Sequence, residues 1–208
     1  MLYTMNMKPR LYFQQKITAF VNKYKVLTVT EAGEPANMIA MAQQKRLAFK
    51  EKVTFYTDEK QTQPSFTFRA EKVMDIHGRY FVEDMNGQLG GSFRKLFGES
   101  LVVSTWRLMD ANGNELLEVK ESNATLAVLR RYGGWIPIVG DIIELVTLFL
   151  KYHFVVVDLS TNQIVGKYEK TTLFRDHYRF SLTDEAYAKL PWQVFAAVGV
   201  GLDALQSR

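Results

Sequence analysis

The most continuous apolar stretch of the chain lies near its C-terminal end. From Leu190 to Val200 only Gln193 interrupts the run of apolar residues. A surface helix has a polar face, whereas a helix that is apolar on every face belongs in a core or a membrane. We therefore predict one central buried helix over residues 184–206. Its predicted core positions are Leu190, Trp192, Val194, Phe195, Val198 and Leu202.

Most of the preceding chain consists of short segments in which apolar and polar residues alternate. In residues 47–56 the apolar side chains share one parity, and charged residues fill most of the other. This period of two is typical of a half-buried β-strand. The apolar positions of that segment are Leu47, Phe49, Val53 and Phe55. Similar segments are found at residues 11–13, 20–28, 38–41, 66–68, 73–76 and 80–82. The pattern predicts a mainly β protein.

Turn signals of one kind recur between these segments. Residues 84–87 (Asp-Met-Asn-Gly) and 110–113 (Asp-Ala-Asn-Gly) each follow an apolar segment and precede another, and residues 158–162 (Asp-Leu-Ser-Thr-Asn) form a weaker copy. Asn-Gly tolerates positive φ at both central positions of a type I′ turn. We therefore predict β-hairpins with type I′ turns at the two Asn-Gly sites.

A second apolar stretch separates the last two turn signals. In residues 133–151, Asp141, Glu144 and Thr147 recur at threefold spacing, which places them on one side of a helix. We predict an inserted amphipathic helix over this range. Its other side packs on the rest of the domain, on a partner or on a membrane. The residues assigned to that face are Trp135, Ile136, Ile142, Ile143, Val146 and Phe149.

Composition narrows the class of protein. The 208 residues fit a single domain over residues 1–208 with a sizeable core. The absence of cysteine excludes disulfides and thiolate metal sites, and a net charge of +4 is far from that of a dedicated nucleic-acid binder. The uncharged run from Leu190 to Leu202 is shorter than the roughly 20 residues of a transmembrane helix. With no apolar leader at its start, we expect a cytoplasmic protein, free or peripheral to a membrane.

The sequence contains no recognisable catalytic or metal-binding pattern. Residues 110–121 place oxygen donors at positions one, three, five and twelve of a calcium loop, but Glu115 occupies position six, where the loop needs Gly. The glycine-rich residues 87–92 do not open a helix, as a phosphate-binding loop would. No metal-ligand spacing relates the histidines His77, His153 and His177. We predict a hairpin turn after Asp110, with no metal site, no cofactor and no enzyme activity.

Basic residues occur in small groups along the chain. On alternating strands such groups usually form solvated faces or protect strand edges. If several converge, they bind anionic phospholipid headgroups, each contributing roughly 1 kcal/mol near a charged surface. Asp141 and Glu144 oppose this alternative because they would face the same surface. The headgroup contacts that it predicts are Lys45, Arg46, Lys50, Lys52, Arg130 and Arg131.

These features together resemble the tubby-like superfamily, in particular its LURP-one-related and phospholipid-scramblase branch. The resemblance rests on the Asp-Asn-Gly turns, the closing segment 174–180 (Phe-Arg-Asp-His-Tyr-Arg-Phe) and the apolar terminal helix, and it is clearest from about Phe66 to Leu205. It implies a closed antiparallel barrel of about twelve strands around a central helix. The calcium segment and cysteine-rich region of scramblases have no counterpart here, and the lipid-binding residues of tubby proteins are not matched.

The resemblance and the residues together lead to a main functional hypothesis and alternatives. The main one is a non-enzymatic binding or scaffold module whose ligand or protein partner is unidentified. The alternative is a peripheral membrane protein that binds anionic phospholipids. A scramblase-like lipid-handling protein or an enzyme is a third interpretation. A function of any of these kinds is expected on the outside of the barrel or around the inserted helix.

Overall fold

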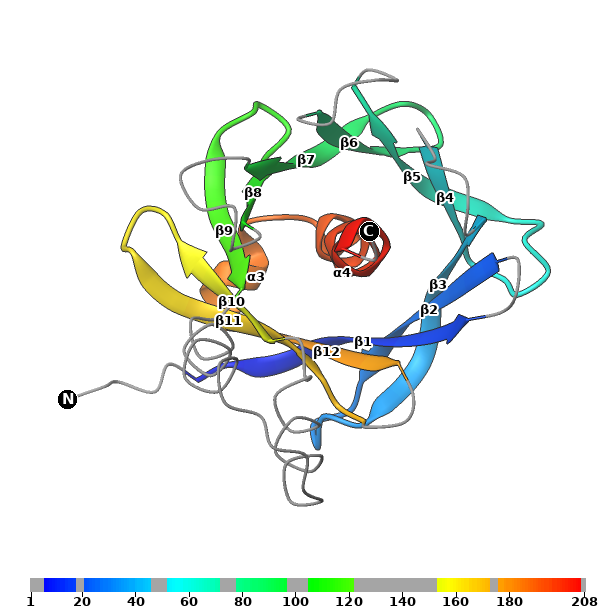
Figure 1. Ribbon diagram of the computed structural model, residues 1–208, viewed down its shortest axis with the longest axis horizontal. Helices are drawn as coiled ribbons and strands as arrows, with labels where there is room; N and C mark the ends of the chain where they lie inside the picture. Colours follow the sequence, from blue (N-terminus) through cyan, green and yellow to red (C-terminus); the bar gives the residue numbers. More distant parts are fainter. Residues whose placement is uncertain are drawn as a thin grey trace, which may run out of the picture.

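The computed structural model describes residues 6–17, 21–45, 52–71, 78–96, 105–121, 153–172 and 176–206. In these ranges twelve strands form one closed antiparallel barrel, in which β1 pairs with β2 on one side and with β12 on the other (Figure 1). The strands are β1 Lys8–Ile17, β2 Val21–Val29, β3 Pro35–Lys45, β4 Lys52–Tyr56, β5 Pro64–Ala70, β6 Arg79–Asp84, β7 Leu89–Leu96, β8 Thr105–Met109, β9 Glu115–Glu121, β10 His153–Asp158, β11 Gln163–Lys170 and β12 His177–Leu182. The predicted fold class is confirmed.

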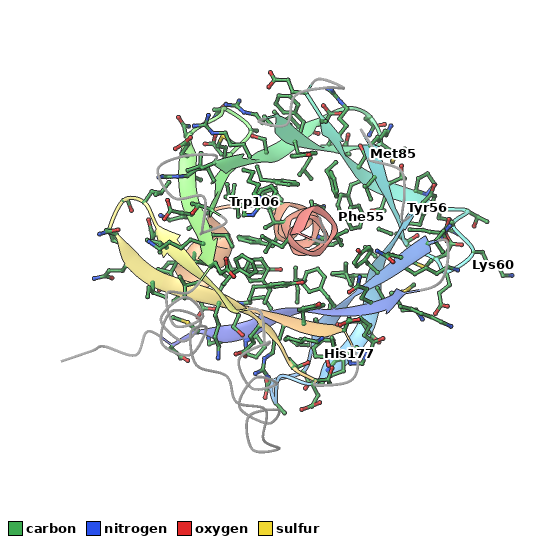
Figure 2. The ribbon with its side chains drawn as sticks, viewed as in Figure 1. Phe55, Tyr56, Lys60, Met85, Trp106 and His177 are labelled. Carbon is green, nitrogen blue, oxygen red and sulfur yellow. The ribbon has the colours of Figure 1, made fainter. Side chains whose placement is uncertain are left out.

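Strand β4 shows how the alternating sequence produces the barrel wall. Val53 and Phe55 are buried, whereas Lys52 is exposed and Thr54 is partly exposed. Successive side chains of a strand point to opposite faces, so the apolar pair faces the interior. Phe55 stacks on Phe66 of β5 with ring centroids 4.2 Å apart, and it points toward the central helix (Figure 2). The period-of-two prediction is confirmed for this strand.

The C-terminal segment forms two helices instead of the one predicted over residues 184–206. They are α3, Asp184–Ala188, and α4, Trp192–Gln206. Thr183 caps α3 by accepting a hydrogen bond from a backbone amide of its first turn at 3.2 Å. Pro191 causes the break because it lacks an N–H and disfavours the helical conformation of the residue before it. The single continuous helix was therefore wrong.

Helix α4 lies inside the ring of strands, as Figure 1 shows in a view along the barrel. Val194, Phe195, Val198 and Leu202 are all buried. Burying one such side chain contributes about 1.5–3 kcal/mol, so these residues account for much of the core. The predicted core positions Leu190 and Trp192 lie at the helix entrance: Leu190 is buried in the preceding turn, and partly exposed Trp192 meets the ring of Phe66 edge-on at 5.4 Å. In the described residues, no helix is long and apolar enough to cross a membrane.

Gly199 allows α4 to approach the wall closely. A Cβ atom at this position would lie 2.4 Å from Cζ of Phe13 on β1, well inside the roughly 3.5 Å at which carbon atoms pack. On β11, Tyr168 donates a hydrogen bond to the carbonyl of Gly199 at 3.1 Å. Two strands, β1 and β11, therefore hold the helix at this residue.

The Asp-Asn-Gly segments form hairpin turns, but not of type I′. Gly87 and Gly113 have φ values of +83° and +85°, whereas neither Asn86 nor Asn112 has positive φ. In the first turn, Oδ1 of Asp84 accepts hydrogen bonds from the amides of residues 86 and 88, both at 2.8 Å. This carboxylate holds a right-handed turn that ends in a left-handed glycine, the geometry of a longer hairpin loop. The type I′ prediction was wrong because it left out the aspartate side chain.

The weaker copy after β10 is also a turn, and a further copy follows β4. Asn162 has a φ of +54°, and its amide donates to the carbonyl of Asp158 at 2.7 Å. After β4, Gln61 has a φ of +60°. The carboxylate of Asp58 accepts hydrogen bonds from the backbone amides of residues 62 and 63, which follow Gln61. That turn contains no Asn-Gly, so the sequence pattern did not identify it.

The antiparallel order gives the barrel two distinct ends. The turns at residues 30–34, 57–63, 85–88, 110–114 and 159–162 lie at one end, which we call the turn end. Helix α3 lies there too, where Lys189 forms an ion pair with Asp158 at 2.7 Å. The other end, where β1, β3, β5, β7, β9 and β11 finish, is called the opposite end.

Candidate binding pocket

A pocket of about 390 Å³ lies on the outside of the barrel wall. It is formed by β1, by the turn between β2 and β3, and by β11, β12 and the residues that follow β11. Its volume falls within the roughly 300–1,000 Å³ typical of small-molecule sites. Its lining residues are Tyr12, Gly33, Glu34, Glu169, Lys170, Thr171, Thr172 and Arg179.

Tyr12 spans the seam between the first and last strands of the barrel. Its neighbours Leu11 and Phe13 belong to the core cluster, so Tyr12 points away from the interior. Its hydroxyl lies 3.1 Å from Oγ1 of Thr171 and 3.2 Å from Nδ1 of His177. These hydrogen bonds fix the phenol across the closing strands, so one side of the pocket is preorganised.

Arg179 and Glu169 face each other across β11 and β12. Nη2 of Arg179 lies 2.7 Å from Oε1 of Glu169, and Lys167 contacts Oε2 of the same carboxylate at 3.0 Å. Burial alone would raise the pKa of Glu169, but hydrogen bonds from Arg179 and Lys167 outweigh it, so the pKa lies below its ordinary value. Glu169 therefore stays ionised near neutral pH, and this group of three side chains carries a net charge of +1.

The turn between β2 and β3 forms the other side of the pocket. Gly33 has a φ of +82°, and its amide donates to the carbonyl of Thr30 at 2.9 Å. A Cβ at Gly33 would lie 3.0 Å from Cγ of Pro9 and 3.6 Å from Nη1 of Arg179. The glycine thus lets the turn lie close to both β1 and the Arg179 guanidinium. Next to it, Glu34 is exposed.

Lys170 completes the lining without adding a net charge. It ends β11 and forms an ion pair at 2.7 Å with Asp176, which directly precedes β12. Within the described residues the pocket therefore combines a positive group around Arg179, a negative side chain at Glu34, and hydroxyl groups between them.

Most of the residues predicted to contact lipid headgroups lie outside the described ranges. Lys52 is exposed at the start of β4, and Lys45 ends β3, with only its backbone described. Arg46 and Lys50 fall in residues 46–51, which the structure does not describe. The remaining headgroup residues, Arg130 and Arg131, and the whole inserted helix predicted over residues 133–151 fall in residues 122–152, also outside the description. The helix-face residues in that segment are Trp135, Ile136, Ile142, Ile143, Val146 and Phe149.

Residues 110–121, which resemble a calcium loop in sequence, begin with a hairpin turn whose own amides bond to the carboxylate of Asp110. Oδ1 of Asp110 accepts hydrogen bonds from the amides of Asn112 at 2.9 Å and Asn114 at 2.8 Å. Oδ2 accepts from the side-chain amide of Asn114 at 2.8 Å, and these bonds lower the pKa of Asp110. Glu115 then begins β9. The hairpin interpretation of this segment is confirmed.

The pocket residues were missed from the sequence because they come from both ends of the chain. Tyr12 and Thr171 are 159 positions apart and meet only when the barrel closes. The sequence holds a partial signal, because Asp176 and His177 form an adjacent acid–imidazole pair and Arg179 follows two positions later. His177 contacts Tyr12 but does not line the pocket, so this pair lies in the right region without identifying the cavity.

Comparison with known proteins identifies one protein family. The family model described as LURP-one-related matches residues 38–190, most of the chain. The match runs from within β3 to the turn before α4 and includes the β11 and β12 residues of the pocket. A search of curated proteins found no match.

Proposed function

We propose that this chain, which belongs to the LURP-one-related family of the tubby-like superfamily, is a non-enzymatic binding module that recognises its ligand on the outer wall of the barrel. The observation that carries the proposal is the occupation of the barrel interior by α4. Every residue from Val194 to Val200 is buried. A ligand of this protein is therefore recognised by the outside of the wall, where the pocket at β1, β11 and β12 provides a concave polar surface.

The electrostatics of the pocket support binding over catalysis. A general base works best when its pKa lies near the working pH. Hydrogen bonds move the pKa of Glu169 below its ordinary value, away from that range. Lys170 is held in an ion pair with Asp176. A carboxylate that stays ionised, as Glu169 does, orients a polar ligand well and exchanges protons poorly near neutral pH.

The test combines ligand binding with a search for turnover. Backbone amide signals of the ¹⁵N-labelled chain are followed by NMR during titration with small anions, cations, zwitterions and sugars. We expect at least one class to shift the signals of Gly33, Thr171 and Thr172 in a saturable manner. Replacement Arg179→Lys should weaken that binding, and Lys60→Gln, in the turn after β4, should leave it unchanged. A hydrolase or transferase activity abolished by Tyr12→Phe or His177→Ala would contradict the proposal.

A second candidate function, binding of anionic phospholipid, is favoured by the order of the strands. Lys45 ends β3 and Lys52 begins β4, while Glu121 ends β9 and His153 begins β10. All four strand ends lie at the opposite end of the barrel. The residues between each pair of strand ends carry basic residues predicted from the sequence to contact headgroups. A basic surface at one end of the barrel is what binding to a charged membrane requires.

Lys52 and Lys60 provide a matched test of this second function. Both are exposed, and Lys52 begins β4 whereas Lys60 lies in the turn that follows β4. Lys52 lies at the opposite end, and Lys60 lies at the turn end. With vesicles of phosphatidylserine and phosphatidylcholine at low salt, we expect Lys52→Gln to weaken sedimentation about fivefold, the equivalent of roughly 1 kcal/mol. Lys60→Gln should leave it unchanged, and added salt should reduce binding by both variants. Equal effects of the two substitutions, or no binding at low salt, would reject a membrane surface at the opposite end.

A further inference from the structure

The two sides of the outer pocket carry opposite charge. On one side, the two cations Arg179 and Lys167 share the single carboxylate of Glu169. On the other side stands Glu34, whose carboxylate forms no ion pair with any residue that the structure describes. Tyr12 and the threonine hydroxyls lie between these groups. The pocket therefore has a positive side, a negative side and a hydrogen-bonding floor.

Arg179 keeps one nitrogen available on the pocket side. Nε and Nη2 both donate to Oε1 of Glu169, at 3.3 Å and 2.7 Å. Nη1 takes part in neither bond, and it lies 3.6 Å from the point where a Cβ on Gly33 would stand. Because residue 33 is glycine, nothing larger than hydrogen projects from its Cα toward Nη1. Arg179 also lines the cavity, so an anionic group can approach this nitrogen from inside the pocket.

We propose that the pocket binds a small zwitterion that carries a primary ammonium and a carboxylate or phosphate. This inference rests on the proposed binding function and names the ligand class of the same site. The anionic group binds Nη1 of Arg179, where charge-assisted hydrogen bonds are strongest. The ammonium binds the carboxylate of Glu34. The hydroxyls of Tyr12 and Thr171, which bond each other and His177, lie between the two charged groups.

The alternatives to a zwitterion fit the charges less well. A simple anion at Nη1 is repelled by Glu34, which lines the same pocket. A simple cation at Glu34 is repelled by the net positive group of Arg179, Lys167 and Glu169. Only a molecule with both charges places each opposite its complement, and like-charge contacts of this kind are what exclude the wrong ligand.

The test compares a complete zwitterion with its two halves. Phosphoethanolamine, inorganic phosphate and ethanolamine are titrated separately into the ¹⁵N-labelled full chain, with glucose as a neutral probe and β-alanine as a carboxylate zwitterion. We expect phosphoethanolamine or β-alanine to shift the amide signals of Gly33, Thr171 and Thr172. The zwitterion that binds should do so at least about tenfold more tightly than phosphate or ethanolamine. Equal affinity for a zwitterion and one of its halves would overturn the proposal.

Two substitutions assign the two charges. Glu34→Gln should weaken zwitterion binding about tenfold and leave any binding of phosphate unchanged or improved. Glu31→Gln is the matched control, because Glu31 is an exposed acid in the same turn that does not line the pocket. Arg179→Lys keeps the charge opposite Glu169 but removes the free guanidinium nitrogen, so it should weaken both zwitterion and phosphate. An unchanged affinity in Glu34→Gln would overturn the assignment of the ammonium.

A vesicle experiment distinguishes a free zwitterion from a lipid headgroup. Vesicles of phosphatidylethanolamine in phosphatidylcholine are compared with phosphatidylcholine alone, whose quaternary ammonium cannot donate a hydrogen bond to Glu34. Binding that depends on phosphatidylethanolamine and on Glu34 supports the lipid-borne form, and binding of the soluble probes alone supports the free form.

If glucose or phosphate saturates the pocket and no zwitterion does, the inference fails and the proposed function stands. If no probe shifts the pocket signals, both fail.

Discussion

The interior of the barrel and the pocket on its outer wall are built by different forces. Inside, α4 contacts the strands through apolar side chains, a hydrogen bond from Tyr168 to its backbone, and the close approach of Gly199 to Phe13. Outside, Glu169 is held between Arg179 and Lys167 within reach of water. The interior thus depends on close packing, and the pocket depends on charged groups.

This difference separates stability from recognition in the same domain. Changing the shape or polarity of a core contact lowers the unfolding free energy by several kcal/mol, whereas an ion pair near the surface contributes about 1 kcal/mol or less. A substitution at the pocket can therefore change ligand binding with little effect on folding. The four predictions below test this separation, beginning with the largest effect.

A charge placed in α4 should have the largest effect. Ala197 is fully buried, so Ala197→Asp puts an unpaired carboxylate in the core and should cost roughly 3–5 kcal/mol of unfolding free energy. Ala188→Asp is the matched control because Ala188 is exposed in α3, and its cost should stay below about 1 kcal/mol. Urea unfolding followed by tryptophan fluorescence measures both. Similar midpoints for the two variants would show that α4 is not central to stability.

A single added methyl group should test the fit of the helix. Gly199→Ala places a Cβ 2.4 Å from Cζ of Phe13. Overpacking of this kind lowers the unfolding free energy by about 1–3 kcal/mol. Phe13→Leu makes space at the same point. We expect the double variant to be more stable than the sum of the single effects predicts, as a double-mutant cycle of unfolding free energies would reveal. Strict additivity would contradict direct contact.

The ion pairs of Glu169 should make stability depend on acid. The pKa of this carboxyl is lowered in the folded state from its ordinary value of 4.5. Its ion pairs therefore stabilise the fold above that value and lose their contribution as pH falls through the lower folded pKa. Between about pH 6 and pH 3 the unfolding free energy of the unaltered chain should fall by about 1 kcal/mol more than that of Glu169→Gln. The difference is modest because water screens the group. Parallel pH profiles in urea unfolding would contradict this role.

The smallest effect is expected at Glu34. It is exposed at the edge of the pocket, so Glu34→Gln should change the unfolding free energy by no more than about 0.5 kcal/mol. Thermal or urea unfolding measures this change. A larger loss would mean that Glu34 holds the turn between β2 and β3, and its effect on ligand binding would then have to be separated from its effect on structure.

The strands and the buried helix were largely predictable from the sequence because local patterns carry them, whereas the closed barrel of about twelve strands was implied by the family resemblance. Alternation in β4 and the apolar run from Val194 to Val200 each depend on neighbours along the chain. The errors arose where one side chain changed a local rule. Pro191 divides the predicted helix, and the carboxylates of Asp84 and Asp110 select a turn other than type I′.

The pocket was not predictable in the same way because long-range pairing creates it. It requires β1 to lie beside β12, and it lies where the wall is irregular. The register of β1 shifts between Pro9 and Leu11 and that of β2 shifts between Leu27 and Val29. Bulges bend strands and increase their twist, and nothing in the residue pattern fixes their position.

The closure of the barrel by its first and last strands has a consequence for folding. Phe13 of β1 pairs with Tyr178 of β12, so this hydrogen-bonding edge of β1 has no partner until β12 has been synthesised. Pairing over such a long sequence separation slows folding, and an open strand edge can pair with another chain in the meantime. The newly made protein therefore passes through a period of vulnerability to aggregation that ends only when its last strand arrives.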